Sequence, residues 1–235
     1  MKTKLMSKKR PGDIGQVYIA VDFEAIDVDT WWTFGSVVTR FPEGNMLETF
    51  QTGCDRSSHV SSDSATSTFW TKHPDAFDAN VKLAGKKSVE EAEQSIVEYI
   101  QSIKARFNDF FLISDSPAFD VRILDNMLQR HNQPVMSMRK GGEYMQALCT
   151  WSYRLAIMQL IGFRSADLPR LHAALGRLPR PVDAVCSDAN SGLLLRHTPL
   201  YDACMFTAQY FKVKDVVASR RGRGYLNPSA IGWRH

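Results

Sequence analysis

The chain has 235 residues, of which 44% are hydrophobic and 23% charged. This composition is typical of a globular domain and excludes an intrinsically disordered chain. The formal net charge is +4, a mild excess that is compatible with a polyanionic partner but also common among unrelated proteins. No apolar stretch is long enough to span a bilayer, and the basic start lacks the apolar region of a signal peptide. We therefore expect a soluble, intracellular, cytoplasmic protein without membrane contact.

The cysteines and the chain ends add little about function. Four cysteines lie far apart and form no C-x-x-C pair, so neither a zinc site nor a disulfide framework is expected. We interpret residues 16–212 as one domain, preceded by a basic flexible leader over 1–15 and followed by a basic tail over 213–235. The basic residues of these ends either contact phosphate groups or are simply solvated; they are Lys2, Lys4, Lys8, Lys9, Arg10, Arg220, Arg221 and Arg223.

Three strands are predicted in the first quarter of the domain. Residues 17–24 alternate, with Val17, Ile19 and Val21 on one face and Tyr18, Ala20, Asp22 and Glu24 on the other. Two further strands over 31–39 and 45–51 are joined by a turn at 42–44, which indicates an antiparallel meander. Trp31 and Trp32 point to opposite faces, so we expect at most one of them in the core.

Helices dominate the remainder of the predicted domain. A Ser/Thr-rich loop over 53–70 precedes the capping box of Ser88 and Glu91, which begins an amphipathic helix reaching Phe107. A short buried strand over 110–113 and a helix from 116–117 to about 131 follow. Residues 134–195 are the least clear; 144–161 form either a helix or a strand and then a helix. A last helix runs from 198–199 to about 211. The order predicts an α/β fold, a mixed sheet flanked by helices.

The first motif that carries chemistry is Asp22-x-Glu24. Side chains two apart on a strand share a face, so these carboxylates project together near its end. Paired hard oxygen donors suit Mg²⁺ or Mn²⁺, although surface strands carry such pairs without any metal. Asp27 and Asp29 are alternatives, but we place them in a turn beyond the strand.

Two further acids share one local pattern. Asp120 and Asp202 each end a phrase of hydroxyl residue, Pro, aliphatic residue, aromatic residue and Asp, beginning at Ser116 and Thr198. A hydroxyl residue suits the N-cap and Pro the first helical position, which places each Asp one turn into a helix. Leu124 and Leu128 continue the face of Asp120, so its carboxylate should point inward. An acid that merely complements the helix dipole is the alternative.

His197 lies just before the last helix and five residues before Asp202. An imidazole at a helix entrance can accept a proton from water near neutral pH, as a general base does. The spacing is only moderately specific, because His73 and Asp78 repeat it. We interpret His73 as a lone surface histidine.

Taken together, Asp22, Glu24, Asp120, His197 and Asp202 resemble the catalytic residues of DEDDh 3'–5' exonucleases of the ribonuclease H-like superfamily. The resemblance covers residues 16–212 and, within the family, favours the branch of phage exonucleases and actinobacterial exoribonucleases. It implies a ribonuclease H-like mixed five-stranded sheet flanked by helices. It also implies two Mg²⁺ or Mn²⁺ ions and removal of nucleotides from 3' ends of RNA or DNA.

The resemblance also implies roles for individual residues. Four acids would bind metal (Asp22, Glu24, Asp120 and Asp202), and His197 would be the base. Four further residues would touch the substrate: Phe23, Ala25, Ser116 and Trp70. Ala25 stands where the family usually has Thr, and Ser116 follows Asp115 where a His-Asn pair is frequent. Core packing competes with base stacking as the role of Phe23, and a homodimer remains open.

Two other functions remain under consideration. The chain could be a catalytically silent nucleic-acid-binding module of the same fold, although such modules usually lack one or more of the five residues. It could also be a metal-dependent hydrolase of mononucleotides or small phosphodiesters.

Overall fold

We analysed a computed structural model of the chain. It describes residues 16–27, 30–40, 45–56, 64–107, 110–136, 147–150, 152, 197–207 and 210. The predicted leader, the predicted tail, the 42–44 turn, the end of the last helix and most of 134–195 lie outside these residues.

The core of the fold is a five-stranded mixed sheet with the order β3-β2-β1-β4-β5. Strands β1 (Val17–Asp27), β2 (Thr30–Arg40) and β3 (Asn45–Gly53) form the predicted antiparallel meander. Strands β4 (Phe110–Ser114) and β5 (Leu148–Cys149) add in parallel at the other side of β1. The meander strands are longer than predicted, so Asp27 is part of β1 and not of a turn.

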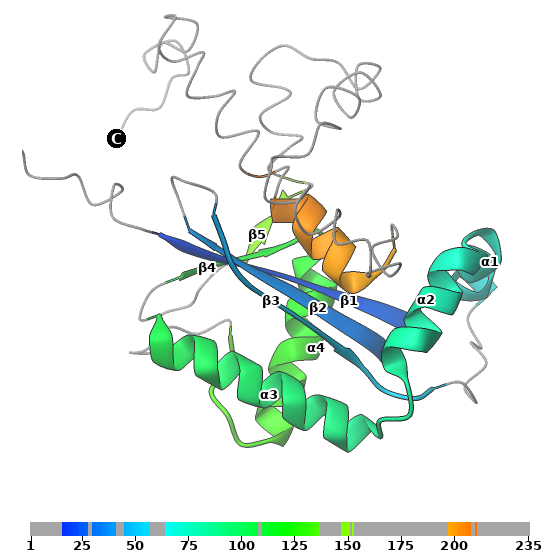
Figure 1. Cartoon of the computed structure of the whole chain (residues 1–235), viewed down its shortest axis with the longest axis horizontal. Helices are drawn as coiled ribbons and strands as arrows, with labels where there is room; N and C mark the ends of the chain where they lie inside the picture. The colour runs from blue at the N-terminus through cyan, green and yellow to red at the C-terminus, as the bar shows by residue number, and fades with distance from the viewer. Residues whose placement is uncertain are drawn as a thin grey trace, which may run out of the picture.

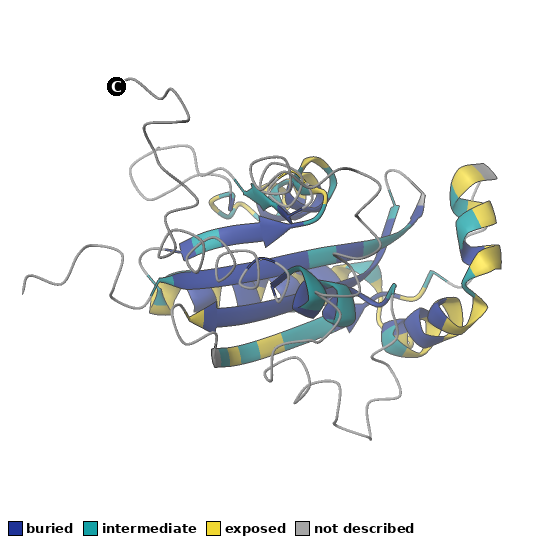
Figure 2. Ribbon diagram, turned by 90° about the horizontal axis from the view of Figure 1, so that it is seen from above, coloured by how far each residue is buried: buried dark blue, intermediate teal, exposed yellow. Residues whose placement is uncertain are grey.

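The alternation along β1 sends its side chains into two different cores. Val17, Ile19 and Val21 pack with residues of α3 (Val89–Arg106) and α4 (Pro117–Arg130). Tyr18 and Ala20 pack against the helix over 199–207 on the opposite face. Figure 1 shows this orange helix in front of the sheet and α4 behind it. The central strands β1, β2 and β4 are buried along most of their length, whereas much of the edge strand β3 is only partly buried or exposed (Figure 2). Helix cover on both faces of the central strands accounts for their burial.

The two predicted helix starts at Ser88 and Ser116 are both observed. Ser88 and Glu91 form the full capping box at the start of α3. Ser116 occupies the N-cap position of α4 with Pro117 directly after it, but its side chain forms no cap hydrogen bond. Its backbone N–H instead donates to Ser114 Oγ at 3.0 Å, so the hydroxyl that orders this turn comes from the end of β4.

Helix α1 (Ser64–Lys72) begins within the predicted 53–70 loop, and α2 (Pro74–Ala84) follows beyond it. They pack at the end of the sheet where Trp32 and Trp70 meet edge to face at 5.7 Å. Trp31 and Trp32 are therefore both buried, and the expectation of one core tryptophan was wrong. The sheet is covered at this end by two helices that were not predicted from the sequence. Within the described ranges, no helix is long and apolar enough to cross a membrane.

Candidate metal centre and its histidine

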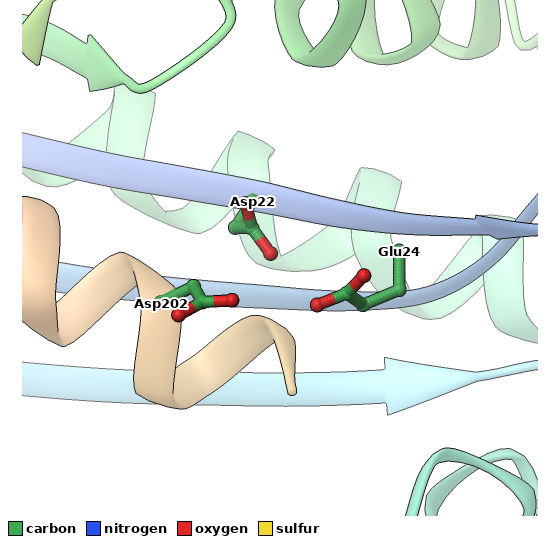
Figure 3. A group of neighbouring side chains, drawn as sticks. All are labelled: Asp22, Glu24 and Asp202. Atoms are coloured by element: carbon green, nitrogen blue, oxygen red, sulfur yellow. The ribbon is translucent and has the colours of Figure 1, made fainter. Parts of the chain in front are cut away.

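Three carboxylates from distant parts of the chain meet over one face of β1. Asp22 and Glu24 project from β1, and Asp202 projects from the helix over 199–207 (Figure 3). One oxygen from each lies within 4.8 Å of the others. Three hard oxygen donors at this separation fit a divalent cation such as Mg²⁺ or Mn²⁺. The structure thus brings together three of the four acids that were predicted as ligands.

A close backbone contact places Asp202 there. Gly35 of β2 is paired with Asp22. A Cβ atom on Gly35 would lie 2.3 Å from the nitrogen of Leu200 and 2.3 Å from the carbonyl carbon of Pro199. The start of the last helix therefore rests directly on the sheet, and only glycine permits this approach. Sequence reasoning did not single out Gly35.

Asp120 lies beside these three acids and is only 2% exposed. Its Oδ1 accepts a hydrogen bond from the Phe23 N–H at 3.1 Å, and its Oδ2 accepts one from Ser114 Oγ. Leu124 and Leu128 on the same face of α4 are also buried, so the carboxylate points inward as predicted. A carboxylate oxygen has two lone pairs, so Asp120 could bind a cation beside these hydrogen bonds.

The crowding of these acids has a clear electrostatic signature. Burial, followed by repulsion from Glu24, Asp120 and Asp202, raises the pKa of Asp22 well above its ordinary value. Burial and the charges of Asp202 and Asp120 raise the pKa of Glu24 to about 8. Burial also raises the pKa of Asp120 to about 7, against the opposing effect of its hydrogen bonds. A cation would relieve this repulsion, so the donor set fits a metal ion.

Asp115 is a fifth acid near the centre that the sequence patterns did not assign. Its charge contributes to the raised pKa values of Asp22 and Asp120. Its Oδ1 accepts a hydrogen bond from Thr150 Oγ1 at 3.1 Å. Thr150, next to β5, thereby holds Asp115 close to the acidic cluster.

His197 stands at the entrance of the last helix, against Asp202. Its backbone N–H donates to Asp202 Oδ2 at 3.1 Å, and its Nδ1 lies 3.9 Å from the same oxygen. Its φ angle is +65°, a left-handed conformation that is uncommon for a residue with a side chain. The imidazole is thereby placed beside the acidic cluster, where a base for a water molecule would be needed.

Two rings from the α1–α2 junction surround this imidazole. The ring of Phe69 meets His197 edge to face at 4.9 Å, and the ring of His73 lies 4.4 Å away between centroids. His73 is partly buried and is not the lone surface histidine that we expected. It was misplaced because α1 and α2, which bring it to His197, were not predicted.

The four residues predicted to touch the substrate differ in how far they are exposed. Phe23 is 4% exposed and packs between Trp31 and Phe34. Trp70 is 7% exposed, and its Nε1–H donates to the Ala25 carbonyl at 3.0 Å. Ala25 itself is partly buried and Ser116 is exposed.

Comparison with known proteins defines the class of fold. No family model matches the sequence, and no curated protein matches it significantly. Solved structures do match: the chain has the α/β ribonuclease H-like fold of known exonucleases, with the five-stranded sheet that the resemblance implied.

Two of these structures show how close the similarity is. Cell-death related nuclease 4 (CRN-4) is 12% identical, with a TM-score of 0.53 over 86% of this chain and 64% of that one. E. coli exonuclease I, bound to a dA16 oligonucleotide, is 13% identical, with a TM-score of 0.53 over 85% of this chain and 41% of that one. The chain thus spans less than two thirds of the length of either nuclease.

Proposed function

We propose that this protein is a metal-dependent 3'–5' exonuclease of the DEDDh type that removes nucleotides from the 3' end of single-stranded RNA or DNA. The observation that carries the proposal is the convergence of Asp22, Glu24 and Asp202, with Asp120 and His197 at their side, on a nuclease fold. CRN-4 and exonuclease I support the class of reaction because their names describe nucleases.

The four acids would hold Mg²⁺ or Mn²⁺, and the resemblance implies two such ions. Such a pair of cations, when bound, supplies Lewis-acid stabilisation of the attacking and leaving oxygens of a phosphodiester. Asp22 and Glu24 offer donors from the rigid sheet, and Asp202 offers one from a helix fixed against Gly35. This rigidity would keep the donors in place without reorganisation during the reaction.

His197 would take the proton from the attacking water. Its ring lies at the edge of the acidic cluster and within 3.9 Å of a carboxylate oxygen of Asp202. Phe69, a partly buried ring beside His197, is better placed to stack a terminal base than the buried Trp70.

The direct test follows the fate of labelled oligonucleotides. A 5'-labelled oligonucleotide should give a ladder of progressively shorter products with Mg²⁺ or Mn²⁺, whereas a 3'-labelled one should release a labelled mononucleotide at once. EDTA should abolish both patterns. Matched RNA and DNA oligonucleotides of one sequence would show which sugar is accepted, since discrimination rests on contacts with the 2'-hydroxyl.

Matched variants separate the proposed site from contaminating nucleases. Asp202→Asn should remove the activity, while Asp78→Asn, on the exposed face of α2, should retain it. A salt-sensitive gel shift without cleavage would instead indicate a silent nucleic-acid-binding module. Release of inorganic phosphate or cleavage of small phosphodiesters alone would indicate a hydrolase of another kind.

A further inference from the structure

Asn80 of α2 is a buried polar side chain that connects the sheet to the turn carrying His197. It is 0% exposed. Its Nδ2 donates to the carbonyl oxygen of His197 at 2.8 Å and to that of Ala76 at 2.9 Å. Its Oδ1 accepts a hydrogen bond from Thr33 Oγ1 at 2.6 Å. The amide therefore uses both N–H donors and its oxygen at once.

The hydrogen-bond partners fix the orientation of the Asn80 amide. Both partners of Nδ2 are backbone carbonyls, which accept and never donate, so the amide cannot turn its oxygen toward them. Thr33 is itself 0% exposed and sits on β2 opposite Glu24. The hydrogen-bond chain from Thr33 through Asn80 to His197 thus starts beside one proposed metal ligand and ends at the proposed base.

The turn at His197 needs such support. A left-handed φ of +65° at a residue with a side chain costs energy and persists only where the surroundings hold it. Asn80 holds the carbonyl of this residue, and Asp202 holds its N–H. Phe69 and His73 at the same helix pair flank the ring. Backbone and ring of His197 are therefore both fixed by α1 and α2 on one side and by Asp202 on the other.

We propose that Asn80 is a positioning residue for the base: it holds the His197 carbonyl and so keeps the left-handed turn that presents the imidazole to the acidic cluster. This inference rests on the proposed function of His197. Asn80 touches neither substrate nor metal, and its effect on cleavage passes through His197. A misplacement of a reacting group by about 1 Å can cost on the order of 100-fold in rate.

A double-mutant cycle on the full chain tests this route of action. Single-turnover cleavage with Mn²⁺ would be measured for the wild type, Asn80→Ala, His197→Ala and the double variant. We expect Asn80→Ala to slow cleavage by ~10- to 100-fold in the wild-type background and by less than about 3-fold where His197 is absent. Equal slowing in both backgrounds would overturn the proposal, because Asn80 would then support the fold as a whole.

Two further variants complete the test, one as a control and one as a substitute for Asn80→Ala. Asn126→Ala, at an exposed position of α4, removes the same amide and should leave the rate unchanged. If Asn80→Ala does not fold, Thr33→Val removes the partner hydroxyl at constant shape. We expect it to slow cleavage about 3- to 10-fold, again only when His197 is present. An unchanged rate in folded Thr33→Val, or its equal slowing with and without His197, would overturn the proposal.

A readout that needs no catalysis distinguishes this inference from the proposed function. Amide hydrogen exchange at His197 reports how firmly the turn is held. We expect Asn80→Ala, or Thr33→Val in its place, to accelerate this exchange by about 10-fold or more relative to amides in β1. Unaltered exchange would refute the role of Asn80. If the wild type cleaves no oligonucleotide, the proposed function fails, while exchange still decides whether Asn80 holds the turn.

Discussion

The backbone N–H of Phe23 donates a hydrogen bond to Asp120 Oδ1 at 3.1 Å, across 97 residues of sequence. The described pairing of β1 with β4 ends at Ala20 and Ile113, so this N–H lies beyond the parallel ladder. Asp120 takes the place of the missing strand partner. A residue predicted as a metal ligand thereby also ties the start of α4 to β1, between the two acids of the first motif.

The two roles of Asp120 can be separated by substitution. Asp120→Asn keeps an oxygen for the Phe23 N–H but removes the charge that would bind a cation. We expect cleavage to fall by ~1000-fold or more, with a thermal unfolding midpoint close to that of the wild type. Asp120→Ala should lower the midpoint by several degrees as well, because a buried N–H loses its acceptor. Near-normal turnover in Asp120→Asn would contradict its assignment as a ligand.

Removal of the proposed base should have a milder effect than removal of a ligand. We expect His197→Ala to slow cleavage by ~10²- to 10⁴-fold while Mn²⁺ binding, measured by calorimetry, persists. His131→Ala is the matched control, because it removes an imidazole at the opposite end of α4 from Asp120, where it pairs with Glu93. Loss of Mn²⁺ binding in His197→Ala would show that His197 is a ligand and not a base.

The raised pKa values predict how stability depends on pH in the absence of metal. The pKa values of about 8 for Glu24 and about 7 for Asp120 exceed their unfolded values. Between about pH 4.5 and pH 8 the folded state therefore retains protons that the unfolded state has released. In EDTA, the free energy of unfolding should fall as pH rises through this window, because the folded state binds more protons.

Two comparisons isolate these acids from other titrating groups. Glu24→Gln should make the decline in unfolding midpoint with pH shallower than in the wild type. Mn²⁺ should raise the midpoint more at pH 8 than at pH 6, because it binds the deprotonated carboxylates. Thermal unfolding monitored by circular dichroism measures both. An identical pH slope in wild type and Glu24→Gln would contradict the raised pKa.

The contact between Gly35 and Leu200 predicts an effect of a single methyl group. In Gly35→Ala, the new Cβ would meet backbone atoms at 2.3 Å, so the last helix must move away from β2. Asp202 would move with it, and we expect cleavage to drop by ~10- to 100-fold together with weaker Mn²⁺ binding. Gly85→Ala, where the added Cβ meets no atom within 4 Å, should reduce stability through its positive φ and retain activity. Full activity in Gly35→Ala would show that the helix position does not matter.

Substitution of Trp70 tests whether this side chain anchors α1 to β1 or stacks a base of the substrate. Trp70→Phe keeps an aromatic ring but removes the hydrogen bond from Nε1 to the Ala25 carbonyl. If Trp70 is an anchor, the variant should lose ~1 kcal/mol in free energy of unfolding, or about 2–4 °C in unfolding midpoint, with little change in KM. Phe69→Leu should instead raise KM if the partly buried ring stacks the terminal base. A raised KM in Trp70→Phe with unchanged stability would favour direct substrate contact.

The features that could be predicted from sequence are those with a strong local signal. The alternation from Val17 to Glu24 predicted both faces of β1, and the capping box at Ser88 predicted the start of α3. The shared phrase before Asp120 and Asp202 predicted two acids one turn into their helices. These patterns depend on residues that are neighbours in sequence, so a period or a spacing is enough to reveal them.

The features that were not predicted from the sequence depend on contacts between distant segments of the chain. Helix α1 carries only a weak apolar period, and the positions of α1 and α2 follow from the contacts of Trp70 with Ala25 and of Asn80 with Thr33. Ser114 holds both Asp120 and the Ser116 N–H, which no spacing rule indicates. Gly35 has a meaning only once Leu200 lies against it.

The seating of the last helix on β2 has a consequence for biosynthesis. A growing polypeptide presents Asp22 and Glu24 early, but the Asp202 carboxylate that meets them emerges only after residue 202 has been made. Until then the two strand acids repel each other with no partner helix to complete the cage. The proposed metal centre is thus completed only once residue 202 has left the ribosome.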